Sequence, residues 1–244
     1  MLTNKPTLLI AALFIAFAAC APEKQETTTP TLSGDTITAA EQAALTPDEI
    51  LTSFEEGNVR YMNNDLTPRD YSAQIAATST GQYPKAVILS CIDSRVPVEK
   101  VFDKGVGDVF VARVAGNTVN PDILGSIEYG AAVAGSKLVV VMGHEACGAV
   151  KAAIDKAELS DNADVLLGRI QPAIDRLNSY AGDQSTKNAD YVDQVVNTNV
   201  STTIEAMLIE SPVLKSMQDE GKIKIVGAYY DLDTGKVTFV EDTK

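Results

Sequence analysis

The chain has 244 residues, of which 45% are hydrophobic, and a formal net charge of −13. This length and hydrophobicity are sufficient for the core of one α/β domain. The acidic balance argues against nucleic acid as a partner, because phosphate binding requires a concentrated basic surface, and the sequence has no run of lysine and arginine. The negative charge is more simply a source of solubility.

The first 20 residues are typical of an export signal rather than of a folded domain. Lys5 precedes an apolar stretch at residues 8–17 that is too short for a comfortable transmembrane helix. The stretch ends in Phe17-Ala18-Ala19-Cys20, which resembles a bacterial lipobox with Cys20 as the lipidated residue, although such motifs usually carry leucine at the position of Phe17. Ordinary cleavage after Ala18 is the alternative. Either reading predicts export to the periplasm or cell envelope, with membrane attachment only through a lipid on Cys20.

The next segment predicts a linker followed by the start of the fold. Residues 21–44 are rich in proline, threonine and glutamate over much of their length, which predicts a disordered linker. We expect a single folded domain over residues 45–244. Its first helix begins near Thr46-Pro47-Asp48-Glu49, where a proline and two acids suit the first turn, and an irregular apolar stripe continues to Met62.

From residue 85 onward, strands and helices alternate. Hydrophobic runs predict strands at residues 85–90, 108–114, 137–142, 222–230 and 237–240. Helical patterns are expected at residues 97–102, 122–134, 145–153, 165–177, 192–209 and 212–219, with a short helix or loop at 71–75. This alternation predicts an α/β fold with a mainly parallel β-sheet flanked by helices on both faces. The turn at residues 233–235 predicts an antiparallel C-terminal hairpin.

Scarce metal-binding residues follow two of the predicted strands. His144 is the only histidine, and Cys91 and Cys147 are two of the three cysteines. Parallel sheets bind ligands beyond the carboxyl ends of their strands, so we expect these three side chains to meet. A set of two cysteines and one histidine leaves a fourth position open, as in catalytic zinc sites. A helix beginning near Glu145 would place His144 and Cys147 on one face, and its N-terminus would favour thiolate at Cys147.

Two further residues close to Cys91 suggest how the fourth position is used. Arg95 offers Asp93 a bidentate partner, and the paired Asp93 would stay ionised and accept a hydrogen bond from metal-bound water. Released from Arg95, Asp93 could instead become a fourth metal ligand and close the site. A disulfide between Cys91 and Cys147 is the alternative for an exported protein, but it leaves His144 without a role. Glu145 is interpreted as a solvated or helix N-terminal acid.

Three motifs together resemble a known family. Cys91-x-Asp93-Ser94-Arg95, then Ala115-Gly116-Asn117, then Gly143-His144-x-x-Cys147-Gly148 is similar to the pattern of β-class carbonic anhydrases. The resemblance implies one Zn²⁺ per subunit on Cys91, His144 and Cys147, with Asp93 and Arg95 as the catalytic pair. It also implies reversible hydration of CO2 to bicarbonate by zinc-bound hydroxide, in a homodimer or higher oligomer whose N-terminal helices pack on a neighbouring subunit.

Two alternatives to this function are open at the level of sequence. A zinc hydrolase on the same fold would act on a CO2 analogue such as CS2 or COS. A non-catalytic zinc-binding envelope lipoprotein would keep Asp93 permanently in the fourth position. The residues that contact substrate are not assigned.

Overall fold

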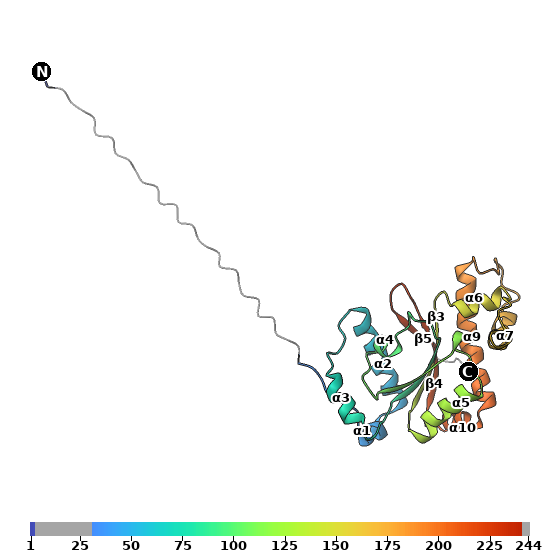
Figure 1. The fold of residues 1–244 in the computed structure, drawn as a ribbon, viewed down its shortest axis with the longest axis horizontal. Coiled ribbons are helices and arrows are strands. Elements are labelled where there is room, and N and C mark those ends of the chain that lie inside the picture. The colour runs from blue at the N-terminus through green and yellow to red at the C-terminus, as the bar shows by residue number, and fades with distance from the viewer. Residues whose placement is uncertain (3–30, 241–244) are drawn as a thin grey trace. The chain divides into compact units, whose positions relative to one another are not determined.

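A five-stranded sheet organises the fold (Figure 1). The computed structural model describes residues 1–2 and 31–240. The sheet has the strand order β2-β1-β3-β4-β5, in which the first four strands are parallel and the last is antiparallel to β4. The bounds of the strands are β1 Ala86–Ser90, β2 Val109–Arg113, β3 Leu138–His144, β4 Lys224–Tyr230 and β5 Val237–Val240. The predicted mainly parallel sheet with an antiparallel C-terminal hairpin is confirmed.

The central strands are hydrophobic at nearly every position because both faces of the sheet are covered. Alternate side chains of a strand point to opposite faces. Ile88 and Val140 accordingly belong to one buried cluster, whereas Val87 and Val139 belong to the other. All residues of β1 and β3 are buried.

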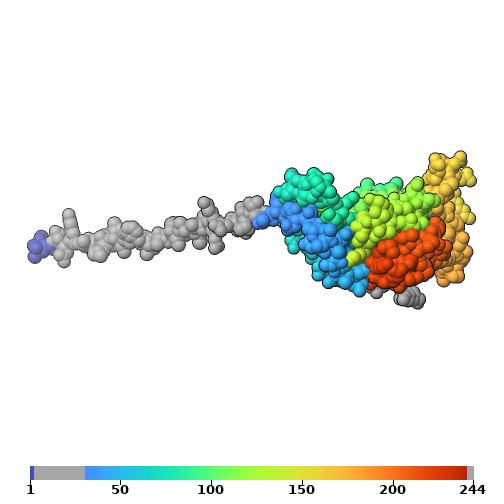
Figure 2. Space-filling view, turned by 90° about the horizontal axis from the view of Figure 1, so that it is seen from below, coloured from blue at the N-terminus to red at the C-terminus, as the bar shows by residue number. Residues whose placement is uncertain are grey.

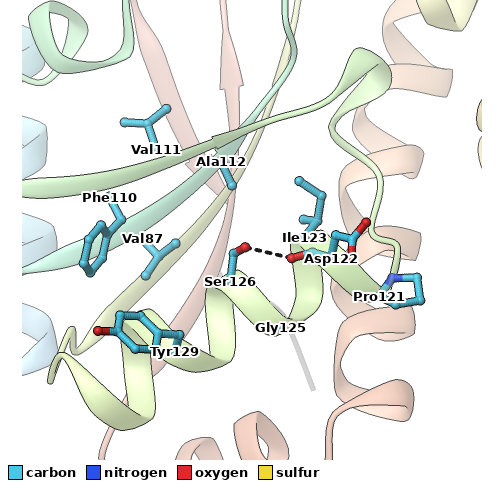
Figure 3. Close-up of a pocket in the computed structure, with 10 residues that line it drawn as sticks. All are labelled: Val87, Phe110, Val111, Ala112, Pro121, Asp122, Ile123, Gly125, Ser126 and Tyr129. Atoms are coloured by element: carbon cyan, nitrogen blue, oxygen red, sulfur yellow. Dashed lines mark hydrogen bonds between the residues drawn. The ribbon is translucent and has the colours of Figure 1, made fainter.

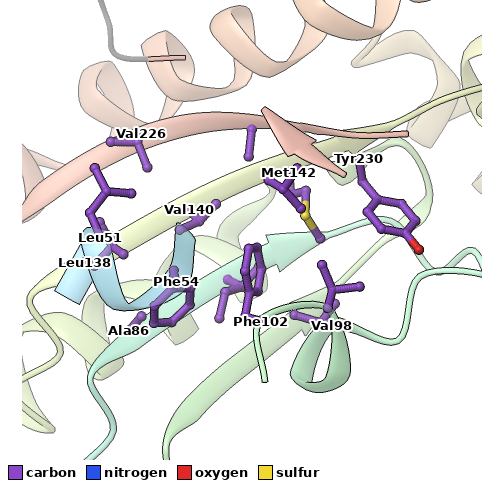
Figure 4. Packing of buried hydrophobic residues seen from close by; sticks show 14 of the residues in the cluster. Leu51, Phe54, Ala86, Val98, Phe102, Leu138, Val140, Met142, Val226 and Tyr230 are labelled. Atoms are coloured by element: carbon purple, nitrogen blue, oxygen red, sulfur yellow. The ribbon is translucent and has the colours of Figure 1, made fainter. Parts of the chain in front are cut away.

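The N-terminal helices cover one face. Their bounds are α1 Ala39–Ala44, α2 Pro47–Met62, α3 Tyr71–Thr78 and α4 Val98–Val101. Buried side chains of α2 and of the segment around α4 pack on the sheet (Figure 4). The rings of Phe54 and Phe102, with centroids 4.9 Å apart, lie at the centre of this contact. The apolar stripe predicted in the first helix therefore faces the protein's own core along much of its length.

The later helices cover the opposite face and the carboxyl ends of the strands (Figure 1). Their bounds are η1 Ala115–Asn117, α5 Pro121–Glu128, η2 Tyr129–Val133, α6 Gly148–Ile154, α7 Asp161–Gly168, α8 Gln171–Arg176, α9 Ala189–Glu210 and α10 Pro212–Asp219. The long helix α9 packs along β3 and β4 through Val200 and Ile204. Segments from both halves of the sequence meet at the surface (Figure 2). The ends of α1 and α10 line one cavity there.

The linker prediction is wrong for its last residues, which belong to the folded unit that begins at Leu32. Thr38 and Glu41 form a capping box that starts α1, and the buried Gln42 side chain donates to the carbonyls of Pro84 and Ala134. These specific polar contacts stabilise a segment whose composition is poor in large apolar residues. The predicted signal and Cys20 lie outside the described residues. Within the described ranges, no helix is both long and apolar enough to cross a membrane.

Three helix predictions are also corrected. The helix expected at residues 122–134 changes to π-helical geometry after Glu128. The single helix expected at residues 165–177 is two helices, which are separated at Arg169 and Ile170. The helix expected from Glu145 begins only at Gly148, and this difference changes how the candidate metal-binding residues are arranged.

Candidate metal centre

Three buried side chains meet beyond the ends of β1 and β3. Cys91 directly follows β1, His144 is the last residue of β3, and Cys147 is the N-cap residue of α6. Because β1 and β3 are adjacent and in register up to Ser90 and Met142, their ends lie side by side. The ligand atoms of the three residues all lie within 4.8 Å of one another. The sequence prediction that these residues meet is confirmed.

The expected shared helix face is wrong. His144 still pairs with Tyr230 in the sheet, and Cys147 lies outside the regular turns of α6. Ala146, between them, has a φ of 51°, which lies in the left-handed region that alanine rarely adopts. A tight loop, and not helical spacing, therefore turns Cys147 back toward His144.

The hydrogen bonding of His144 fixes which nitrogen is free to bind a metal. Nδ1 lies 2.9 Å from the backbone oxygen of Glu145. Since a carbonyl oxygen only accepts, Nδ1 carries the proton and Nε2 keeps its lone pair. Nε2 is buried and has no hydrogen-bond partner among the described residues. A buried, unpartnered acceptor beside two sulfur atoms is the arrangement that a metal ion would satisfy.

The two cysteines are free thiols whose sulfur atoms lie 4.0 Å apart, about twice the length of a disulfide bond. The hydrogen bond with Cys147 lowers the pKa of Cys91 to about 4. The same hydrogen bond, together with burial, raises the pKa of Cys147 well above its ordinary value. Zinc binds cysteine as the thiolate, so a cation bound between the sulfurs would displace their protons. Two thiolates and one imidazole fit Zn²⁺.

The loop after β2 supports the Cys91 sulfur. The backbone N–H of Gly116 donates to Cys91 Sγ at 3.4 Å. Gly116 has a φ of 70°, and a Cβ at this position would lie 2.7 Å from Ile170 Cδ1. The buried side chain of Asn199 on α9 donates to the Gly116 carbonyl at 2.8 Å. Asn199 was missed from the sequence because it lies 83 residues away from this loop.

Asp93 and Arg95 form the predicted pair at the mouth of the site. Arg95 Nε and Nη2 donate to the two carboxylate oxygens of Asp93 at 2.9 and 2.7 Å. These hydrogen bonds hold the pKa of the Asp93 carboxyl well below its usual range, although partial burial opposes the shift. Asp93 Oδ2 lies 3.8 Å from His144 Nε2. The carboxylate is thus ionised, adjacent to the three ligands and engaged by Arg95.

Arg113 is a second arginine at the site that sequence reasoning missed. Its guanidinium donates to the backbone oxygens of Cys91 and Asp93 at 2.9 and 2.5 Å. Arg113 ends β2 in register with Ser90, so it lies beside the loop that carries Cys91. A charged residue at the carboxyl end of a strand next to β1 was the signal that could have identified it.

A separate cavity of about 660 Å³ lies between the edge strand β2 and α5 (Figure 3). Apolar side chains that include Val87, Phe110 and Ile123 line it, with the ring of Tyr129 at one end. None of the three candidate ligands contributes to its wall. The cavity and the metal centre are therefore distinct features of the subunit.

Comparisons with known proteins identify the family. A sequence model of the family described as carbonic anhydrase matches residues 86–237. Carbonic anhydrase 2 of Mycobacterium tuberculosis is 34% identical over 185 residues, which cover 75% of this chain and 88% of that protein.

Solved structures show the same fold. A tetrameric β-carbonic anhydrase of Sordaria macrospora superimposes with a TM-score of 0.61 and 22% identity over 79% of this chain and 95% of that one. A β-carbonic anhydrase of Aspergillus fumigatus gives a TM-score of 0.63 and 23% identity over 81% and 91%. The chain belongs to the β class of the carbonic anhydrase family, whose general reaction is the hydration of CO2.

Proposed function

We propose that the protein catalyses the reversible hydration of CO2 to bicarbonate and a proton with one Zn²⁺ per subunit bound by Cys91, His144 and Cys147. The observation that carries this proposal is that His144 Nε2 is buried and has no hydrogen-bond partner among the described residues, in a cluster with two free thiols whose ligand atoms all lie within 4.8 Å of one another. When bound, zinc supplies a Lewis acid that lowers the pKa of a coordinated water to about 7. Three protein ligands leave a coordination position for that chemistry.

The pairing of Asp93 with Arg95 determines whether a carboxylate oxygen of Asp93 can reach the open coordination position. Arg95 occupies both oxygens of Asp93 and holds the carboxylate as an acceptor beside the site. Asp93 is ionised at neutral pH, so it can accept a hydrogen bond but cannot donate one. The Arg95 contact opposes movement of Asp93 onto the ligand cluster, where it would become a fourth ligand and exclude water.

The test combines metal analysis with stopped-flow CO2 hydration by the purified full chain. We expect about one zinc per subunit in the wild-type protein. His144→Ala should lose both the zinc and the activity. Arg95→Ala should retain zinc but lose most activity at neutral pH, because Asp93 is released toward the ligands. A wild-type chain that is zinc-free as purified and gains no activity from added zinc would contradict the proposal. Full activity of Arg95→Ala at neutral pH would refute only the role of the pair.

We further propose that the subunit assembles into a homodimer or higher oligomer through its N-terminal helices. Val59 and Met62 on α2 are 50% and 38% exposed, although the rest of the apolar stripe on this helix is largely buried. The relative from Sordaria macrospora is described as tetrameric. Val59→Glu should shift the mass measured by light scattering toward the monomer if this face is the interface, whereas the wild-type mass should exceed that of one chain.

We also propose that the protein is exported and lipid-anchored at Cys20. The apolar run at residues 8–17 and the lipobox-like Phe17–Cys20 support this. Incorporation of labelled palmitate should be lost in Cys20→Ser. Equal labelling of both chains would exclude Cys20 as the lipidation site, and no labelling of the wild type would favour ordinary cleavage after Ala18.

A further inference from the structure

Glu145 connects the metal-binding loop to the rest of the fold through both its backbone and its side chain. Its backbone oxygen accepts the hydrogen bond of His144 Nδ1 at 2.9 Å, and its backbone N–H donates to the Tyr230 carbonyl at 2.9 Å. Its carboxylate oxygen Oε2 accepts from the backbone N–H of Leu232 at 2.9 Å. The prediction that Glu145 is a solvated or helix N-terminal acid is therefore wrong.

The carboxylate contact falls just past the last residue pair of the sheet. Strand pairing between β3 and β4 ends at His144 and Tyr230. The next residues turn sharply through Ala146, whose φ of 51° is unfavourable for alanine. A loop in such a conformation persists only when its surroundings hold it, and the Glu145 side chain is one of the groups that do so.

The partner of Glu145 is itself rigidly held. Leu232 belongs to the turn between β4 and β5, in which the Asp231 carboxylate accepts from the backbone N–H groups of Asp233 and Thr234, each at 2.9 Å. The far end of this turn is fixed to α2, because the buried Asn58 side chain donates to the Gly235 carbonyl at 2.9 Å and accepts from the Val237 N–H at 2.8 Å.

From this geometry we infer that Glu145 is a positioning residue for the metal centre. By bonding to Leu232, its carboxylate fixes the peptide whose carbonyl orients the imidazole of His144. The outer hydrogen bond of a metal-binding histidine sets its tautomer and orientation, and its loss typically weakens metal binding about 10–100-fold. The inference rests on the proposed zinc site at Cys91, His144 and Cys147. It concerns how firmly the metal is retained.

The test is the rate at which zinc passes from the holoenzyme to an excess of a chromogenic chelator. Glu145→Gln keeps an oxygen that accepts from Leu232 but removes the charge, so its rate should stay within about twofold of wild type. Glu145→Asp keeps the charge but is one methylene too short, so it should lose zinc about tenfold faster, as should Glu145→Ala. Glu158→Ala, at an exposed glutamate outside the site, is the matched control and should behave as wild type.

The thermal midpoint of each variant separates positioning from a merely structural role. A lower midpoint in Glu145→Ala with an unchanged rate of zinc loss would overturn the inference. So would fast loss in Glu145→Gln combined with slow loss in Glu145→Asp, because charge rather than the hydrogen bond would then matter. If the wild type itself retains no zinc, the proposed zinc site fails; if all variants retain zinc equally well, only the role of Glu145 fails.

Discussion

Asp93 and Asp103 lie ten residues apart in the sequence, and each is paired with arginine. The two aspartate–arginine clusters differ in burial and in the number of partners. Among the described residues, the Asp93 carboxylate has a single arginine partner, Arg95, whose side chain is 54% exposed. Asp103 has two, Arg60 and Arg69, and its own side chain is fully buried. The first cluster lies beside the candidate metal centre, whereas the second joins α2, the segment before α3 and the residues just after α4.

The number of partners determines what each carboxylate can do. Arg60, Arg69 and Thr67 all donate to the Asp103 carboxylate. Burial would raise the pKa of Asp103, but these hydrogen bonds outweigh it and lower the pKa to about 2. Asp103 cannot move without leaving two guanidinium groups unpaired. The Asp93 carboxylate has to leave only one residue, Arg95, in order to move. The same residue pair is therefore a structural junction in one place and, in the proposed function, a group that can move in the other.

The largest expected effect is on stability, from Asp103→Ala. Removing one partner of a buried ionic cluster typically costs about 3–5 kcal/mol, because the remaining charges lose their compensation. Chemical denaturation should therefore show a loss of this size. The folded fraction should keep its zinc, since none of the three ligands contacts Asp103. A loss below about 1 kcal/mol is typical of exposed ion pairs. It would show that the Asp103 cluster does not stabilise the fold more than the Asp93 cluster does.

A smaller effect is expected from acid. The folded pKa of Asp103 lies below its ordinary value of 3.8, so its contribution to stability is complete above about pH 4 and is lost as pH falls toward about 2. The difference between the folded and the ordinary pKa of Asp103 corresponds to roughly 2 kcal/mol of stability. In Asp103→Asn this part of the pH dependence should be absent. Parallel stability curves for the wild type and the variant between pH 4 and 2 would contradict the assignment.

The two arginines of the Asp103 cluster should differ from each other. Arg69 is 11% exposed and also donates to the Thr67 and Asp103 carbonyls, whereas Arg60 is 36% exposed and makes one contact with the carboxylate. We expect Arg69→Ala to cost about 2–3 kcal/mol and Arg60→Ala about 1 kcal/mol, because hydrogen bonds to charged groups are worth more when buried. Equal losses in denaturation experiments would show that burial does not decide their contributions.

The sequence was sufficient to predict the sheet and the meeting of Cys91, His144 and Cys147. Buried parallel strands are marked by continuous hydrophobic runs, and His144 has no competitor as the only histidine. The pairing of Asp93 with Arg95 was also predictable because the two residues are close in sequence. These features depend on local pattern and on residue scarcity.

Contacts between distant segments could not be predicted in the same way. Asn199, Arg113 and Leu232 support the metal loops from other elements, and nothing in their local sequence indicates which backbone group they meet. The ordered α1 was missed because its stability depends on capping and on the buried Gln42 rather than on apolar residues. The loop at Ala146 was missed because its positive φ goes against the preference of alanine.

The smallest effect on stability is expected at Asp93, where function should change most. Asp93→Asn removes the charge that pairs with Arg95. Because the Arg95 side chain is 54% exposed, solvent screens this ion pair, and such pairs contribute about 0–1 kcal/mol. The midpoint of chemical denaturation should therefore hardly move. CO2 hydration should nevertheless fall substantially, because an asparagine amide cannot replace an ionised acceptor beside the three candidate ligands.

Arg60→Lys, at the other cluster, is the control and should keep its activity. If Asp93→Asn instead lost several kcal/mol and kept its activity, Asp93 would be a structural junction like Asp103, and the proposed role of its pair with Arg95 would be wrong.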